Sequence, residues 1–406
     1  DKDSGNGTIV NNLFVGNLRS PDVNADDQIP WVRPQSAVYI ENVPRALSGN
    51  VVSGAVDAGF TYRVPACAAD HARWYSRNEA HGVRIGVFML PTTNAAGCVR
   101  VDGVTVWKAA HIGVLAVDGI ANIEVTGAVL SDNHIGLSLN FIKSGREESY
   151  SRLRNAVVYG TTLASSSCAE SVSCAAASKE DTAGIGCNSV LGGGYRRAGV
   201  LMPQYANRGK TCDQDWLPVC RPANTPERLC GMPWERRYGT ISTVNTAAYL
   251  ENVRFGYFAL TDCGKRSTAL VHNPTQIDQS VPHYASGIVW ENVPVDARFH
   301  FTWNQYTDEK CSDGVGCDSL NNLDVRDVDG SLTGTRGGLV VGPNPTNIYS
   351  TPDCVARANW TGFECPSVNL IRGHIEAVDA GRVAMGGLQV TRRPDPADNS
   401  TWRTSM

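Results

Sequence analysis

The sequence has little positive charge and no long apolar segment. Its 406 residues carry a formal net charge of −4, so no basic surplus indicates nucleic-acid binding. No run approaches the roughly 18 apolar residues of a membrane-spanning helix. The chain starts at Asp1 without methionine, signal peptide or anchor. We therefore expect a mature or excised piece, with any membrane attachment in segments outside this chain.

Patterns typical of metal sites and of nucleophilic catalysis are also missing. The cysteines do not form two closely spaced Cys-x-x-Cys pairs, which argues against a zinc cluster. No Cys-His or Ser-His-Asp arrangement is visible, and the glycines at 192–194 lack the lysine and following helix of a phosphate-binding loop. We therefore predict neither a cofactor nor a metal site.

Cysteine, in contrast, is abundant. Thirteen cysteines are many for an intracellular chain of this length, and three N-glycosylation sequons begin at Asn6, Asn359 and Asn399. Cysteines, sequons and low charge together favour an oxidising, extracellular setting. The odd number leaves at least one thiol free or bonded outside this chain.

Two local disulfides are expected near the C-terminal end. Cys311 and Cys317 enclose five residues rich in aspartate and glycine, and Cys354 and Cys365 flank one turn-like loop. Six further cysteines lie between Leu163 and Asn245, where we expect two or three bonds, with Cys263 as a further partner. These loops bury little apolar surface, so crosslinks must stabilise them; closing about 15 residues contributes roughly 3 kcal/mol.

Short, β-branched, strand-like runs recur along the chain, whereas helical periodicity is scarce. One repeated feature is a glycine that follows a polar turn and precedes an apolar strand. It occurs at Gly59, Gly86, Gly113 and Gly136, at intervals of 27, 27 and 23 residues. Imperfect periods of roughly 20 to 30 residues, each with several short strands, indicate a solenoid whose repeats share one core.

A second repeat is the tripeptide Glu-Asn-Val after an apolar strand, at 41–43, 251–253 and 291–293. Asparagine and glycine suit corners at which the chain adopts left-handed backbone angles. A β-sandwich is the alternative, but its hairpins recur about every 8 to 12 residues, which is shorter than the spacing here. A parallel β-helix is therefore favoured.

The predicted fold class is all-β, a right-handed parallel β-helix (solenoid) with a disulfide-rich loop excursion. Residues 1–162 form the N-terminal coils in this interpretation, and residues 163–245 the cysteine-rich insertion. The C-terminal coils then span 246–390, and 391–406 is a tail.

The stretch NNLDVRDVDGSLTG, residues 321–334, places aspartates before a glycine. In an EF-hand loop with Gly330 at the sixth position, the first ligand would be Val325 and the twelfth Arg336. Neither side chain offers the required oxygen. We therefore interpret the stretch as a short strand that ends in an Asp-Gly turn.

The segment from Ser36 to Ile142 resembles the parallel β-helix region of fibrocystin, fibrocystin-L and the cell-surface hyaluronidases. The matching stretches are YIENVPRALSGNVVSGAVDAGFTYRVPAC, YSRNEAHGVRIGVFM, VTVWKAAHIGVLAVDG and GAVLSDNHIGLSLN. Three later stretches are similar to the same family: YLENVRFGYFALTDCGKRSTALVHNP, CSDGVGCDSLNNLDVRDVDGSLTG and DCVARANWTGFEC. The resemblance covers about three quarters of the chain.

The resemblance implies an extracellular β-helix in a large cell-surface protein. Fibrocystin and its relatives are single-pass membrane proteins with large ectodomains, found on cilia, stereocilia or cell surfaces. The hyaluronidase branch cuts glycans, but its proposed catalytic residues lie largely in a glycine-rich domain before the β-helix. No part of this sequence matches that domain, so we predict no catalytic residues.

A glycosidase would need two carboxylates about 5 to 9.5 Å apart across a groove. The candidates are Asp26, Asp27, Asp132, Asp324, Asp327 and Asp329. No spacing selects a pair among them, and we interpret Asp132, Asp327 and Asp329 as turn and corner residues.

Two histidines occupy the same place in successive repeats. His111 and His134 lie two residues before Gly113 and Gly136, so stacked coils would place them one above the other. We expect a solvated stack; a metal-binding or pH-sensing pair is the alternative.

The expected function is an extracellular scaffold that presents loops to other extracellular or cell-surface proteins and to glycans. Candidate contact residues are Trp216, Trp234, Tyr238, Trp303 and Tyr306. The alternative is a glycan-degrading enzyme, which would need a groove along one sheet face with clustered acids or arginines.

Overall fold

The computed structural model divides into two compact units, Asp1–Leu370 and Ile371–Met406. It describes residues 7–16, 36–41, 44–56, 58–64, 75–91, 97–116, 120–140, 149–162, 195–204, 246–272, 283–301, 324–341, 354–366, 389–391 and 403–405. In the second unit, β27 (Gln389–Thr391) pairs antiparallel with β28 (Arg403–Ser405).

The described part of the first unit is built from β-strands, most of them in parallel sheets. Its described residues contain two short 3-10 turns, η6 (Val295–Ala297) and η8 (Ala358–Trp360), and no α-helix. Within these residues no helix has the length and apolarity needed to cross a membrane. The all-β prediction is confirmed.

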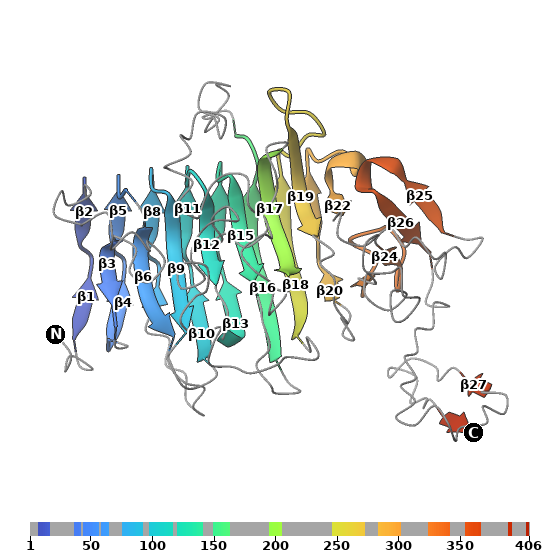
Figure 1. Cartoon of the computed structure of the whole chain (residues 1–406), viewed down its shortest axis with the longest axis horizontal. Coiled ribbons are helices and arrows are strands. Elements are labelled where there is room, and N and C mark those ends of the chain that lie inside the picture. Colours follow the sequence, from blue (N-terminus) through green and yellow to red (C-terminus); the bar gives the residue numbers. More distant parts are fainter. Residues whose placement is uncertain are drawn as a thin grey trace, which may run out of the picture. The chain divides into compact units, whose positions relative to one another are not determined.

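A smaller sheet contains eight strands in sequence order, and Figure 1 shows them following one another through the first unit. They are β3 (Ser36–Ile40), β6 (Ala58–Val64), β9 (Ile85–Pro91), β12 (Ile112–Ala116), β15 (Ile135–Asn140), β17 (Tyr195–Gln204), β19 (Arg266–His272) and β22 (Phe299–Phe301). Every pairing between these neighbours is parallel.

The predicted glycine repeat sets the register of this sheet. Ala58 pairs with Ile85, Ile85 with Ile112, and Ile112 with Ile135, which reproduces the intervals of 27, 27 and 23 residues. Each repeat glycine directly follows one of these paired residues in the sequence. It lies against the backbone carbonyl of the next repeat glycine on the neighbouring strand. A Cβ atom on Gly59, for example, would lie 2.8 Å from the carbonyl oxygen of Gly86, so only glycine permits this approach.

The larger sheet consists of two rows of parallel strands, with antiparallel strands at its C-terminal end. The first row is β1 (Thr8–Val10), β4 (Ala46–Ser48), β7 (Tyr75–Ser76), β10 (Gly97–Asp102), β13 (Ile120–Thr126), β20 (His283–Ser286) and β23 (Asp324–Asp327). The second row is β2 (Leu13–Val15), β5 (Val51–Ser53), β8 (Glu79–His81), β11 (Thr105–Trp107), β14 (Val129–Ser131) and β21 (Val289–Glu291). The long strands β16 (Ser149–Tyr159) and β18 (Thr246–Gly256) contribute to both rows.

Left-handed residues mark the corners at both ends of the second row. Those before it are Asn11, Gly49, Arg77, Gly103, Gly127, Asn155, Asn252 and Gly287. Those after it are Gly16, Gly54, Gly82, Lys108, Asp132, Tyr257 and Asn292. Asn252 and Asn292 belong to the repeated Glu-Asn-Val tripeptides, and both have a φ of 53°. The predicted role of asparagine at the corners is thus confirmed at these two positions.

The core between the sheets is apolar, but three asparagines cross one edge of it. The amides of Asn12, Asn50 and Asn78 occupy the same position in successive repeats. The Asn50 amide nitrogen donates to the Asn78 oxygen over 2.9 Å, and the Asn78 nitrogen donates to the Leu47 carbonyl over 2.8 Å. Asn50 and Asn78 are fully buried, and their burial is tolerated because each amide bonds to a neighbouring repeat.

The structure departs from the predicted division of the chain in two places. β17 lies inside the predicted insertion at 163–245, yet it pairs with both β15 and β19. The insertion is therefore interrupted by a strand of the smaller sheet. The C-terminal parallel strands were expected to continue to residue 390, but beyond β23 the pairing in the first unit is antiparallel, through β24 (Leu339–Val341), β26 (Gly362–Cys365) and β25 (Val355–Arg357).

Candidate functional site

The outward side chains of the first row bring charged and aromatic residues from distant segments together. The register places Arg100, Glu124, Arg152, Tyr249 and Tyr284 side by side on β10, β13, β16, β18 and β20. The inward residues beside them are apolar apart from buried Ser151 and His283, so the strand alternation holds the charged and tyrosine side chains on the opposite side. We call this surface the first-row face.

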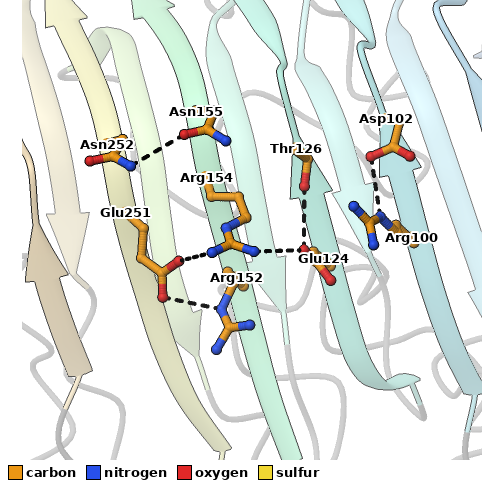
Figure 2. A network of polar contacts seen from close by, with 9 residues as sticks. All are labelled: Arg100, Asp102, Glu124, Thr126, Arg152, Arg154, Asn155, Glu251 and Asn252. Carbon is orange, nitrogen blue, oxygen red and sulfur yellow. Dashed lines mark hydrogen bonds and ion pairs between the residues drawn. The ribbon is translucent and has the colours of Figure 1, made fainter.

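Ion pairs connect the strands of the first-row face, as Figure 2 shows. Arg154 lies 3.5 Å from Glu124 on one side and 3.0 Å from Glu251 on the other. Glu251 also forms an ion pair with Arg152, whose Nε lies 3.3 Å from its carboxylate. One arginine thus bridges three neighbouring strands.

The charges of this network balance. Arg100 pairs with Asp102 at 3.2 Å, and the remaining two arginines of Figure 2 pair with two glutamates. Three positive and three negative groups leave no net charge among them. The network therefore favours neither a strongly anionic nor a strongly cationic ligand.

Tyrosine rings extend the same face. The guanidinium of Arg152 lies 5.1 Å from the ring centroid of Tyr150 and 5.2 Å from that of Tyr249. Tyr249 in turn stacks on Tyr284, with centroids 5.2 Å apart and planes 9° apart. Because these ring faces are turned toward neighbouring strands, a ligand here would meet mainly ring edges and polar groups.

The second row carries a different cluster. The indole of Trp107 stacks on the ring of His81, with centroids 4.2 Å apart and planes 10° apart. Its Nε1 donates to Oε1 of Glu79 over 3.0 Å. His81 and Glu79, both on the neighbouring strand β8, thus fix the orientation of the indole.

Further along the second row, Glu291 accepts three hydrogen bonds. They come from the hydroxyls of Tyr257 (2.9 Å) and Tyr159 (3.1 Å) and from Arg254 (3.2 Å). The bonds from Tyr257 and Arg254 lower the pKa of Glu291, whereas the bond to Glu291 raises the pKa of Tyr257. Glu291 is therefore ionised at neutral pH and acts as an acceptor, which makes it a poor general acid.

The Asp-rich stretch forms the predicted turn. Asp327 is fully buried, and its carboxylate accepts the amides of Gly330 (2.9 Å), Leu332 (3.0 Å) and Thr333 (2.7 Å). Gly330 has a φ of 92°, as an Asp-Gly turn requires. The acidic side chain thus has a structural role in the turn.

Asp132 also occupies the corner predicted for it. It has a φ of 57°, and its carboxylate accepts the amide (2.8 Å) and the hydroxyl (2.7 Å) of Thr162. Asp26 and Asp27, and the side chain of Asp324, lie outside the described residues.

The histidine prediction is half wrong. His111 and His134 do stack, with centroids 6.2 Å apart, but both are buried rather than solvated. Nδ1 of His134 lies 3.0 Å from the carbonyl of Arg196 on β17. We expected solvated rings because the sequence analysis did not identify β17 as a strand of this sheet. β17 covers the His134 side of the pair.

Burial changes the protonation of these rings. It lowers the pKa of His134 to about 4 and that of His111 well below its ordinary value. In the described part of the chain, His, Cys, Asp and Glu side chains do not form a group of three that could hold a metal ion.

The structure contains a disulfide between Cys354 and Cys365, the pair that the sequence analysis names. Cys98 and Cys263 each take part in a disulfide as well. Cys311 and Cys317 lie outside the described residues, as do all the cysteines of the predicted insertion. Their pairing stays a prediction.

Of the three sequon asparagines, Asn359 is described. It lies half-buried in η8, and its backbone carbonyl accepts Arg266 over 2.7 Å. Asn6 and Asn399 fall outside the described residues, as do the candidate contact residues Trp216, Trp234, Tyr238, Trp303 and Tyr306. Glycosylation at all three asparagines stays a prediction.

Comparison with known proteins identifies no family for the chain. No family model matches it, and no curated protein does. The resemblance to the fibrocystin β-helix region stays a prediction.

Proposed function

We propose that the chain is a right-handed parallel β-helix that serves as an extracellular scaffold. Three sets of parallel strands support the fold: the smaller sheet and the two rows of the larger sheet. Each repeat adds one strand to each set, with left-handed corners at both ends of the second row. Right-handed crossovers account for about 98% of connections between parallel strands, which supports the proposed hand.

The observation that carries the scaffold proposal is the pairing of the outward carboxylates. Glu124 and Glu251 are each bonded to arginine, and Glu291 is bonded to two tyrosine hydroxyls and an arginine. Such groups hold neighbouring repeats together. A glycan hydrolase would instead direct two carboxylates toward a sugar between them.

The extracellular setting is part of the proposal. The Cys354–Cys365 disulfide fits an oxidising compartment, and so do the bonded cysteines Cys98 and Cys263. From the resemblance to fibrocystin we propose that the chain is a segment of a larger cell-surface glycoprotein, of the kind that also occurs on cilia. In that setting the repeats would present loops and faces to other surface proteins and to glycans.

A glycan-degrading enzyme is the second candidate, and one observation favours it. Arginines and glutamates do cluster on one sheet face, as such an enzyme would require (Figure 2), and tyrosine rings lie beside them. The two functions make different predictions for a polysaccharide substrate.

The test is size analysis of labelled hyaluronan and pectin after incubation with the purified chain, with and without calcium. The scaffold proposal expects unchanged chain lengths. Shortening that disappears in Glu251→Gln or Glu291→Gln, but persists in the exposed control Asp296→Asn, would establish the enzyme instead.

A further inference from the structure

The second row contains a gap between two aromatic side chains. Trp107 on β11 pairs with Ser131 on β14, and Ser131 pairs with Tyr159 on β16. Neighbouring strands are about 4.8 Å apart, so the two aromatic residues start roughly 9.6 Å apart with only a small hydroxyl side chain between them.

Trp107 turns one indole face toward this gap. Its other face is covered by His81, which lies on β8, on the side away from Ser131. Within the described residues, no ring or cation packs on the face toward β14. Exposed Val129, two residues before Ser131 on β14, adds apolar surface beside it.

Tyr159 leans away from the gap because Gly256 has no side chain. A Cβ atom on Gly256 would lie 2.6 Å from Cε1 of Tyr159, so the ring passes over this residue. The hydroxyl of Tyr159 thereby reaches Glu291 on β21, two strands away. The lean widens the space over Ser131.

The space suits the thickness of a sugar ring. Carbon atoms in van der Waals contact lie about 3.5 to 4.0 Å apart, so a ring placed on the Trp107 face would lie over Ser131. The hydroxyl of Ser131 has no hydrogen-bond partner within the described residues, and it faces the same space. An aromatic face beside a free hydroxyl matches a ligand with one C–H-rich face and a hydroxyl-bearing rim.

The charges around the gap favour an uncharged ligand. Glu79 is bonded to the indole nitrogen and lies 3.9 Å from His81, and Glu291 pairs with Arg254. Lys108, the residue after Trp107, is the cation next to the gap in sequence, and it is itself engaged in an interaction. An acidic sugar would therefore lack a free counter-charge here.

We propose that Trp107, Ser131 and Tyr159 form a binding site for a neutral sugar residue of a glycan chain. Trp107 stacks on the sugar ring, Ser131 bonds to one of its hydroxyls, and Tyr159 closes the far side. This inference identifies neutral glycans as a partner class of the proposed scaffold, and it therefore rests on the proposed function.

The test is calorimetric titration of the full chain with cellohexaose, xylohexaose, mannohexaose and chitohexaose, and with a hyaluronan hexasaccharide as the acidic comparison. At least one neutral hexasaccharide binds and changes tryptophan fluorescence. Trp107→Ala weakens that binding about tenfold or more. Ser131→Trp fills the gap and abolishes binding while keeping the aromatic surface. Tyr39→Ala, which removes an exposed ring from the smaller sheet, leaves binding unchanged.

Three results would overturn the site: no binding of any neutral hexasaccharide at millimolar concentration, binding of hyaluronan alone, or equal binding by wild type and Ser131→Trp. Circular dichroism shows whether each variant is folded. If Trp107→Ala does not fold, the binding measured for Ser131→Trp decides the outcome. The polysaccharide sizing assay tests the scaffold independently. A failed site with intact hyaluronan and pectin leaves the scaffold standing, whereas shortening of either polymer refutes it.

Discussion

The carboxylate of Asp329 accepts the backbone amide of Gly287 over 2.7 Å. At the equivalent corner of an earlier repeat, the amide of Gly127 donates to the carbonyl of Arg154 on the next strand. A side chain at Asp329 thus replaces the backbone acceptor that a further repeat would supply. The adjacent amide of Ile288 is bonded in the same way to the Ser331 hydroxyl over 2.8 Å. The Asp-rich turn therefore ends the stack of parallel corners.

Removing the Asp327 carboxylate should destabilise this end of the fold. Asp327→Ala leaves three buried or half-buried amide donors without their acceptor. An unsatisfied buried donor costs about 1 to 3 kcal/mol, so we expect a loss of roughly 3 kcal/mol or more in the free energy of unfolding. Urea denaturation measures it, with exposed Asp296→Ala as the control. A loss below that of the control would show that the turn does not depend on this carboxylate.

The sequence was most informative where backbone packing leaves one choice of residue. Gly59, Gly86, Gly113 and Gly136 predicted the register of four strands, because a side chain at these positions would collide with the next carbonyl. The next member, Gly199, was missed. It lies 63 residues beyond Gly136, and that distance hides the periodicity even though the two residues are in contact.

The outward faces were less accessible to prediction. Alternation shows that a side chain such as Arg154 points away from the core, but its partner Glu251 lies almost a hundred residues later. Their contact depends on the register between β16 and β18, which a long intervening segment separates. The gap at Ser131 depends likewise on the lean of Tyr159 over Gly256, which local sequence does not encode.

Filling a repeat glycine should distort the smaller sheet. In Gly136→Ala the new Cβ would lie 2.5 Å from the carbonyl oxygen of Gly199, so a strand must shift. Overpacking of this kind costs about 1 to 3 kcal/mol. The matched control is Ser138→Ala on the same strand, which removes a buried hydroxyl without adding volume. Thermal unfolding of both variants compares them, and an equal melting temperature would contradict the close approach.

The buried histidines should make the fold sensitive to acid. Burial keeps His111 and His134 neutral in the folded state, with a pKa of about 4 for His134 against an ordinary value near 6.5. Between these values the unfolded state binds more protons than the folded state. Stability is therefore full above pH 6.5 and falls as the pH decreases toward 4.

Replacing the pair should reduce that dependence. The double variant H111L/H134L cannot protonate at these positions, so its free energy of unfolding should change less between pH 6.5 and 4 than that of the wild type. Buried His283, whose pKa is also about 4, remains and keeps part of the slope. Urea titrations at several pH values give both slopes. Identical slopes would mean that the pair is accessible to protons in the folded state.

The Cys354–Cys365 disulfide should stabilise the antiparallel end of the first unit. It joins the residue before β25 to the last residue of β26, with a sequence separation of 11 residues. Closing a loop of this size contributes about 3 kcal/mol in the chain-entropy model. The double variant C354S/C365S should therefore unfold at lower urea concentration, and amides of β25 and β26 should exchange with solvent before those of β12 and β15. Because η8 lies inside the loop and places buried Trp360 against Phe299, the early opening should also change tryptophan fluorescence. Unchanged exchange in β25 and β26 would mean that this packing, rather than the crosslink, holds the end of the unit together.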